Sequence, residues 1–198
     1  MNSFNLKNKV ALITGGNGGI GLGIAKGLAL SGATVVISGR NNPKTSQALS
    51  WKSSTNKSLD SAISMDVTNE KSIVEGIQSI KEKFGKIDIL VNNAGINIRK
   101  APEQYNLSEW NSIISTNLTG VFLTTQAFLP KMIQRRRGDL FMIGSMSGKK
   151  GDPGSSAYAA SKFGLRGFAE ALLHEVRRKD IRVVMINPSS IDSGPDTE

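Results

Sequence analysis

Tyr158 and Lys162 lie four positions apart in the segment 155–164 and could act as one acid–base pair. On a helix, residues four apart share a face one turn apart. A phenol ordinarily titrates at about pH 10, but a nearby ammonium and a helix N-terminus both favour the phenolate. The spacing therefore indicates a tyrosine that exchanges protons near neutral pH. Taken alone, the pair also fits a packed tyrosine and a solvated lysine on an amphipathic helix.

A glycine-rich loop follows the first apolar run of the chain. Residues 9–14 are typical of a buried parallel strand, and residues 22–31 form an amphipathic pattern that Gly32 can end. Between them the loop fits Gly-x-Gly-x-x-Gly at positions 16, 18 and 21, and Gly-x-x-x-Gly-x-Gly at 15, 19 and 21. Strand, glycine loop and helix in this order predict a phosphate-binding turn, because glycines admit the phosphate and the helix N-terminus offers N–H donors.

Arg40 follows the second apolar run, residues 33–38, where dinucleotide-binding folds often place an acidic residue on the adenosine ribose. No acid stands there in this chain. A guanidinium at this point could bind a 2′-phosphate through two parallel hydrogen bonds. The residue favours NADP over NAD, although a solvent-facing arginine in a loop is the simpler interpretation.

Apolar runs and helical patterns alternate along the rest of the chain, which predicts an α/β protein with a doubly wound parallel sheet. The further predicted strands are 62–65, 87–91, 139–143 and 181–186. The predicted helices after the first are a short one within 42–59, then 69–84, 108–136, and one that carries Tyr158 and ends near residue 179. We expect one domain over 1–198, about six parallel strands with helices on both faces, and ligands at the C-terminal ends of the strands.

Caps and breakers set the expected helix ends. Thr68 can cap a helix from Asn69 to Phe84, and a glycine follows its last residue. Ser108 is expected to cap one long helix reaching residue 136. Asn117 on the apolar side of that helix is unexpected, because a buried amide needs hydrogen-bond partners.

Composition excludes several kinds of site. The 198 residues include no cysteine, which excludes disulfides and thiolate metal sites, and the single histidine, His174, excludes a multi-histidine metal site. The sequence has no apolar run of membrane-spanning length and no signal-peptide pattern at its start, so we expect a cytoplasmic protein without membrane contact. The net charge is +9, but the basic residues are scattered and aromatic residues make up only 6% of the chain, so no nucleic-acid partner is expected.

Over its whole length the chain resembles the short-chain dehydrogenase/reductase family, whose fold is the Rossmann fold. The motifs that carry the resemblance are Thr14-Gly15-x-x-x-Gly19-Ile20-Gly21, Asp66-Val67, Asn92-Asn93-Ala94-Gly95, Asn117, Ser145 and Tyr158-x-x-x-Lys162. The resemblance implies an NAD(P)-dependent oxidoreductase that interconverts a secondary alcohol and a ketone by hydride transfer.

The resemblance also implies roles for individual residues. Tyr158 would be the general acid for reduction or the base for oxidation, and Lys162 would favour its phenolate and hold the nicotinamide ribose. Ser145 would hydrogen-bond the substrate oxygen, and Asn117 would carry a water that links Lys162 to solvent. The implied cofactor-binding residues, with Arg40 added from the argument above, are Gly15, Asn17, Gly19, Ile20, Gly21, Arg40, Asp66, Val67, Asn93, Ala94, Gly95, Tyr158, Lys162, Pro188, Ser189 and Ile191.

The C-terminal part departs from the family pattern. Where the family usually has Pro-Gly after the sixth strand, this chain has Pro188-Ser189, which puts a backbone contact to the nicotinamide amide in doubt. The family usually continues with a substrate-covering segment and a seventh strand, which this sequence lacks. We therefore expect either a fragment or a shortened member, and a homodimer or homotetramer for a full-length form.

The substrate is open among a few classes. The glycine loop and residues 92–97 favour a small-molecule sugar, polyol or general alcohol and its ketone. The basic surface favours a 3-oxoacyl group on an acyl carrier protein, and a cofactor-binding module without turnover is the third alternative.

Overall fold

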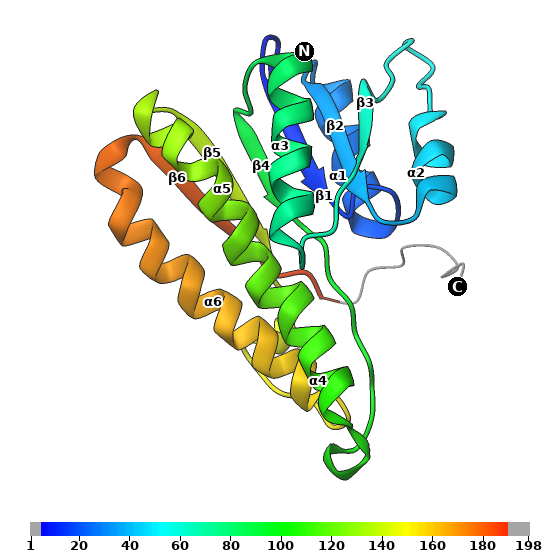
Figure 1. The fold of residues 1–198 in the computed structure, drawn as a ribbon, viewed down its shortest axis with the longest axis vertical. Coiled ribbons are helices and arrows are strands. Elements are labelled where there is room, and N and C mark those ends of the chain that lie inside the picture. The colour runs from blue at the N-terminus through cyan, green and yellow to red at the C-terminus, as the bar shows by residue number, and fades with distance from the viewer. Residues whose placement is uncertain (1–4, 190–198) are drawn as a thin grey trace.

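The computed structural model describes residues 5–189, and within them a six-stranded parallel sheet forms the centre of the molecule (Figure 1). Its strands are β1 (Val10–Thr14), β2 (Thr34–Gly39), β3 (Ser61–Ser64), β4 (Ile89–Asn92), β5 (Gly138–Ile143) and β6 (Ile181–Ile186). Their order in the sheet is β3-β2-β1-β4-β5-β6, and each neighbouring pair is parallel. The predicted doubly wound sheet is confirmed, and its strand order reverses between β1 and β4, where such sheets open a ligand crevice.

Helices cover both faces of the sheet. They are α1 (Gly19–Leu30), α2 (Asn42–Leu49), α3 (Glu70–Phe84), α4 (Leu107–Ile114), α5 (Gly120–Gln134) and α6 (Ser156–Val176). Helices α1 and α2 lie on one side of the sheet and α3, α5 and α6 on the other, with α4 extending α5 beyond the sheet (Figure 1). The glycines expected to end α1 and α3, at positions 32 and 85, both have positive φ.

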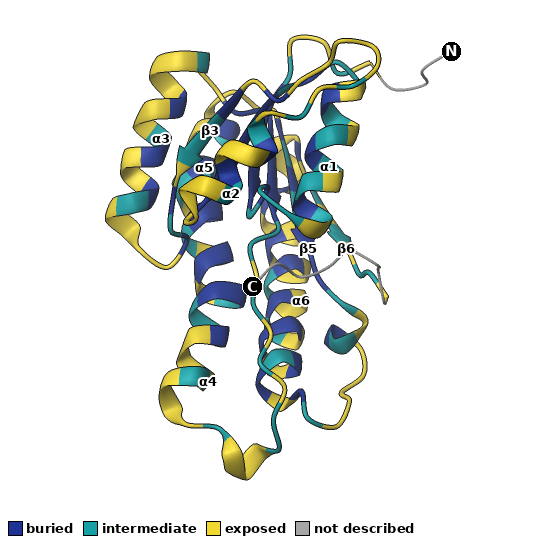
Figure 2. Cartoon of the chain, turned by 90° about the vertical axis from the view of Figure 1, so that its right-hand side faces the viewer, coloured by how far each residue is buried: buried dark blue, intermediate teal, exposed yellow. Residues whose placement is uncertain are grey.

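Successive residues of the strands contribute alternately to two separate apolar cores. On one face, Leu12, Leu90 and Leu140 pack against α3, α5 and α6. On the other face, Ile13 and Ile37 pack against the alanine-lined side of α1 and α2. Figure 2 shows the buried strands between helices whose outward sides are exposed. The central strands β1, β2 and β4 are buried on both faces and read as continuous apolar runs, whereas β3 and β6 are partly exposed along their length.

Two predicted helix caps are wrong by one or two residues. Asn69, not Thr68, caps α3 by accepting a hydrogen bond from the Ser72 amide, and Thr68 instead donates to Asp66. Asn106, not Ser108, caps α4 and forms a capping box with Glu109. Asparagine serves as well as serine or threonine at an N-cap, so the backbone position decided between them.

The long helix expected over 108–136 is interrupted. Residues Ser115–Thr119 form a π-helix between α4 and α5. The widened turn contains Asn117, which is completely buried. Such turns are rare and occur frequently at functional sites.

Within residues 5–189, no helix has the length and apolar character that crossing a membrane requires.

Candidate active site

A cleft of about 820 Å³ opens at the C-terminal ends of the central strands. It lies at the strand-order reversal between β1 and β4 and is lined by most of the residues proposed from sequence. Those residues are Gly15, Asn17, Gly19, Ile20, Gly21, Arg40, Asp66, Val67, Asn93, Ala94, Gly95, Tyr158 and Lys162.

Asn93, directly after the neighbouring strand β4, holds the glycine loop in place. Its side-chain amide donates to Thr14 O at 2.9 Å and to Gly15 O at 3.1 Å. The Thr14 hydroxyl in turn accepts hydrogen bonds from the backbone amides of Asn93 and Ala94, at 3.0 and 3.1 Å. The side chain of Asn93 thus fixes the loop shape as well as lining the cleft.

The loop needs glycine for two physical reasons. Gly15 has φ +62, a conformation that residues with side chains rarely adopt. A Cβ added at Gly21 would lie 2.4 Å from Gly15 O and 2.4 Å from Asn93 Nδ2. The first turn of α1 thus packs directly on the loop, and its N-terminus faces the cleft.

That N-terminus fits a pyrophosphate. Gly18 caps α1 without a side-chain hydrogen bond, and the first turn carries no acidic residue. No side-chain acceptor occupies the N–H groups of this turn, and no acidic side chain repels an anion from them. The residues present therefore suit the phosphates of a dinucleotide.

Tyr158 lies in the first turn of α6, and Lys162 lies one turn later on the same face. The Lys162 ammonium is 5.6 Å from the centre of the tyrosine ring. Both side chains line the same cleft as the glycine loop. The structure thus brings together the predicted acid–base pair and the predicted phosphate-binding turn, which are well over a hundred residues apart in sequence.

Lys162 is buried, with 4% of its surface exposed, and its ammonium donates to Ile143 O at 2.8 Å. Burial lowers the pKa of Lys162 from 10.5 to about 8. The interpretation of this lysine as a solvated residue on a helix surface is therefore wrong. A buried cation at the end of β5 places positive charge inside the cleft rather than at its rim.

Ser145 follows Gly144, which lines the cleft, but is not itself part of the lining. Its hydroxyl oxygen accepts a hydrogen bond from the Ser147 amide at 3.1 Å. A hydroxyl held in this way through its oxygen keeps its own proton for another acceptor. This suits a group that donates to a substrate oxygen.

Asn117 lies behind the cleft and braces the chain after β4. Its amide nitrogen donates to Ile96 O at 2.9 Å and to Ser161 Oγ at 3.1 Å, and its oxygen accepts from the Ile96 amide at 2.8 Å. These contacts account for a buried amide inside a helix. They join the segment after β4, the π-helix and α6 through one side chain.

Arg40 lies at the outer end of the cleft, 3.9 Å from an oxygen of Asp66. Its side chain is 61% exposed, so this ion pair is weak. The other oxygen of Asp66 accepts two hydrogen bonds from Thr68. Arg40 is therefore free to turn toward an anion at this end.

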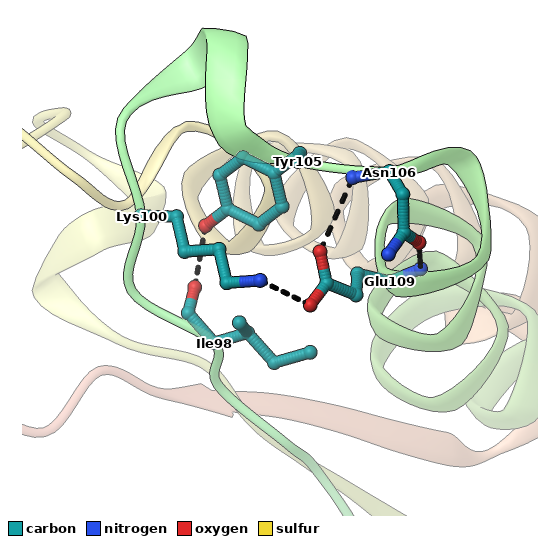
Figure 3. A network of polar contacts seen from close by, with 5 residues as sticks. All are labelled: Ile98, Lys100, Tyr105, Asn106 and Glu109. Carbon is teal, nitrogen blue, oxygen red and sulfur yellow. Dashed lines mark hydrogen bonds and ion pairs between the residues drawn. The ribbon is translucent and has the colours of Figure 1, made fainter.

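The segment 96–106 leads from β4 to α4 and is held by its own polar contacts (Figure 3). The Tyr105 hydroxyl donates to Ile98 O, and the Lys100 ammonium pairs with Glu109. These contacts to Lys100 and to the Asn106 amide lower the pKa of Glu109. The Lys100 amide also donates to Gly154 O at 3.0 Å, which ties the segment to the loop before α6.

The two described C-terminal residues proposed from sequence, Pro188 and Ser189, are not brought into the cleft. Pro188 accepts a hydrogen bond from the Met146 amide at 3.0 Å, and Ser189 is exposed, but neither lines the cleft. Ile191 lies outside the described residues.

Sequence reasoning missed part of the lining. Gly18, already part of the predicted glycine pattern, lines the cleft, and the additional residues are Gly39, Asn41, Lys44, Met65, Ile96, Asn97, Thr116, Ile143 and Gly144. Most of them lie next to a predicted residue at the end of a strand. Their position at the strand ends could therefore have identified them from the sequence. Lys44 comes from α2 and had no such signal.

Comparisons with known proteins agree with this arrangement. The family model for short chain dehydrogenases matches residues 9–198. The 3-oxoacyl-[acyl-carrier-protein] reductase FabG of Chlamydia muridarum is 40% identical over 193 residues, which cover 98% of this chain and 77% of that protein. The crystal structure of gox2181 superposes with a TM-score of 0.90 at 33% identity, over 95% of this chain and 74% of that one.

A metagenomic short-chain oxidoreductase, solved in complex with NADP, has a TM-score of 0.87 at 32% identity and matches 93% of this chain and 84% of its own. The family match, the sheet order and the cleft lead to one conclusion. The chain belongs to the short-chain dehydrogenase/reductase family and is an NAD(P)-dependent oxidoreductase that acts on CH–OH groups.

Proposed function

We propose that this chain interconverts a ketone and a secondary alcohol with NADP as the hydride carrier and Tyr158 as the general acid or base. The observation that carries the proposal is the cleft that Tyr158 and the buried Lys162 share with the glycine loop. When bound, the nicotinamide supplies the hydride for reduction or accepts it in oxidation.

During reduction, negative charge develops on the substrate oxygen, and the chain supplies two groups to meet it. Tyr158 gives its phenolic proton to that oxygen, and Ser145, held through its own oxygen by Ser147, donates a second hydrogen bond. Lys162 provides positive charge 5.6 Å from the ring as the proton leaves. In alcohol oxidation the same groups act in reverse.

Lys162 lines the inner wall of the cleft, and Asn117 supports that wall from behind. The three hydrogen bonds of Asn117 fix Ile96, which lines the cleft, against α6. We propose that Asn117 positions this wall. We also propose that the backbone at Asn117 holds a water that exchanges protons with Lys162. Fixed groups of this kind cost little reorganisation when charge develops.

The cofactor preference is proposed from the outer end of the cleft. Arg40 lines it and has only a weak partner in Asp66, which suits the 2′-phosphate of NADP. We expect Arg40→Ala to weaken NADPH binding more than NADH binding in a fluorescence titration. Equal losses for the two cofactors would remove the argument for a 2′-phosphate site.

Two substrate classes follow from different observations. The motif pattern of the glycine loop and residues 92–97 favours a sugar, polyol or general alcohol. The reductases named FabG, 35–40% identical to this chain, favour a 3-oxoacyl thioester. The segment 96–106 carries the exposed Arg99 beside the paired Lys100, and this arginine suits the acidic carrier of such a thioester.

The test is a panel of ketones offered to the purified chain with NADPH, read as loss of NADPH absorbance. The panel includes an acetoacetyl thioester, a keto sugar acid and a simple cyclic ketone. Turnover of one class establishes it and excludes the others as the main substrate. NADPH binding without turnover of any ketone would contradict the proposed reaction and leave a binding module.

We also propose that copies of the chain assemble into a homodimer or homotetramer. Helices α4, α5 and α6 expose large apolar side chains, among them Trp110, Phe122 and Phe163, each more than a third exposed. Light scattering at micromolar concentration tests this, and a monomer across the range would contradict it.

A further inference from the structure

Lys44 reaches from α2 across the glycine loop. A Cβ built on Gly18 would lie 2.7 Å from Lys44 Cε and 3.0 Å from Lys44 Nζ. The lysine ammonium therefore occupies the space that a side chain at position 18 would fill. Both residues line the cleft at the same end as Arg40.

The position of Lys44 is set by a tie between the glycine loop and α2. Asn17 Nδ2 donates to Thr45 Oγ1 at 3.0 Å, and that hydroxyl donates to Asn41 O at 2.7 Å. Asn17 reaches α2 over Gly39, where an added Cβ would lie 2.4 Å from the amide nitrogen. The stem of Lys44 thus starts from a fixed point next to the loop, and little ordering remains to be done when a ligand binds.

Two of the first peptide groups of α2 have no N–H available to an anion. The Lys44 amide is used by the Asn41 side chain at 3.0 Å, and Pro43 has no N–H group. Side chains are therefore important donors to an anion at this point. The two cationic side chains that line the cleft here are Arg40 and Lys44.

The two cations differ in their surroundings. Arg40 lies 3.9 Å from Asp66, the carboxylate that lines the same end of the cleft. Within residues 5–189, no carboxylate forms an ion pair with Lys44. An ammonium without a counter-ion, half-buried beside a phosphate-binding loop, is matched to a second phosphate.

We infer that Lys44 is the second cation that holds the 2′-phosphate of NADP, and that Gly18 is glycine so that this lysine can lie across the loop. The inference rests on the proposed use of NADP and adds a residue from α2 to the single arginine after β2. On this inference Arg40 and Lys44 bind the 2′-phosphate together.

Two nucleotide fragments test this without any catalytic turnover. The probes are 2′,5′-ADP and 5′-AMP, which differ by the 2′-phosphate alone, and calorimetric titration gives the ratio of their affinities. We expect Lys44→Met to lower that ratio about tenfold, because a hydrogen-bonded charge pair is lost while the unbranched stem is kept. Lys44→Arg should keep most of the ratio, and Lys81→Met, which removes an exposed charge on α3, should leave it unchanged.

Gly18→Ala provides a second, independent measurement. Gly18 has extended backbone angles that any residue can adopt, so the new methyl group displaces only the end of Lys44. The affinity ratio should fall in this variant as well. An unchanged ratio in Lys44→Met would overturn the role of the lysine, and an unchanged ratio in Gly18→Ala would overturn the reason given for the glycine.

The test also separates this inference from the proposed cofactor. If the unmodified chain binds 2′,5′-ADP no better than 5′-AMP, the preference for NADP fails first, and the role of Lys44 fails with it. If the unmodified chain discriminates and Lys44→Met still does, the preference stands and only the role of Lys44 is refuted.

Discussion

Replacing Lys162 with methionine should change how the stability of the chain depends on pH. Burial lowers the pKa of Lys162 from 10.5 to about 8. Each pKa unit corresponds to about 1.4 kcal/mol, so keeping this lysine protonated in the folded chain costs about 3 kcal/mol. Because the folded-state pKa is the lower one, the unfolded chain binds more protons between pH 8 and 10.5, and folding is favoured as pH rises.

The methionine variant lacks this titration. At pH 7 it avoids the desolvation cost but loses the hydrogen bond to Ile143 O, which is worth about 1–3 kcal/mol. The change with pH in the difference between the two free energies of unfolding is therefore easier to interpret than its value at pH 7. We expect the free energy of unfolding of the unmodified chain, minus that of Lys162→Met, to rise by about 2–3 kcal/mol between pH 7 and pH 10.

Urea unfolding followed by tryptophan fluorescence at several pH values measures this difference. Lys81→Met is the matched control, since it removes one exposed positive charge at the far end of α3. The control reports how a general change of net charge behaves over the same range. A difference between the unmodified chain and Lys162→Met that stays flat from pH 7 to pH 10 would refute the reasoning that burial governs this lysine.

Two further substitutions test the framework of the cleft. Gly21→Ala should abolish NADPH binding and lower the free energy of unfolding by about 1–3 kcal/mol, because the added methyl group would lie 2.4 Å from Gly15 O. NADPH binding is measured by fluorescence titration. Unchanged binding would contradict the packing of α1 on the glycine loop. Asn117→Ala should cost about 2–4 kcal/mol in urea unfolding, because it removes three hydrogen bonds and strips the Ile96 amide of its acceptor. The exposed Asn111 on α4 provides its control, and equal effects of Asn111→Ala and Asn117→Ala would contradict the bracing role.

The sequence predicted the strands well because their physical signal is local. Parallel strands buried on both faces are short apolar runs, and the polar residues that follow them mark the edge where ligands bind. Tyr158, Arg40 and the glycine loop could be placed at one edge from this rule alone. They meet in one cleft because of the strand order. The alternation of strands and helices along the chain already favoured a doubly wound sheet of this kind.

Other features depend on contacts between segments that are distant in sequence. The apolar spacing of 108–136 is the same whether or not one turn widens, so the π-helix around Asn117 left no trace in the pattern. The burial of Lys162 depends on how closely α6 packs on β5, which spacing does not report. From the sequence, Lys44 is indistinguishable from a surface lysine. The structure shows that Asn17 is hydrogen-bonded to α2 and that the Lys44 ammonium lies over Gly18.

The central claim is that Tyr158 transfers a proton in an NADPH-dependent reduction, and Tyr158→Phe tests it most directly. The variant keeps the ring that faces Lys162 and removes only the hydroxyl, so NADPH affinity should be nearly unchanged. Its rate with the best ketone of the panel should fall by about 10²–10⁴-fold, the usual contribution of general acid catalysis. A variant that retains more than about a tenth of the unmodified rate would contradict the assignment of Tyr158 as the acid–base residue.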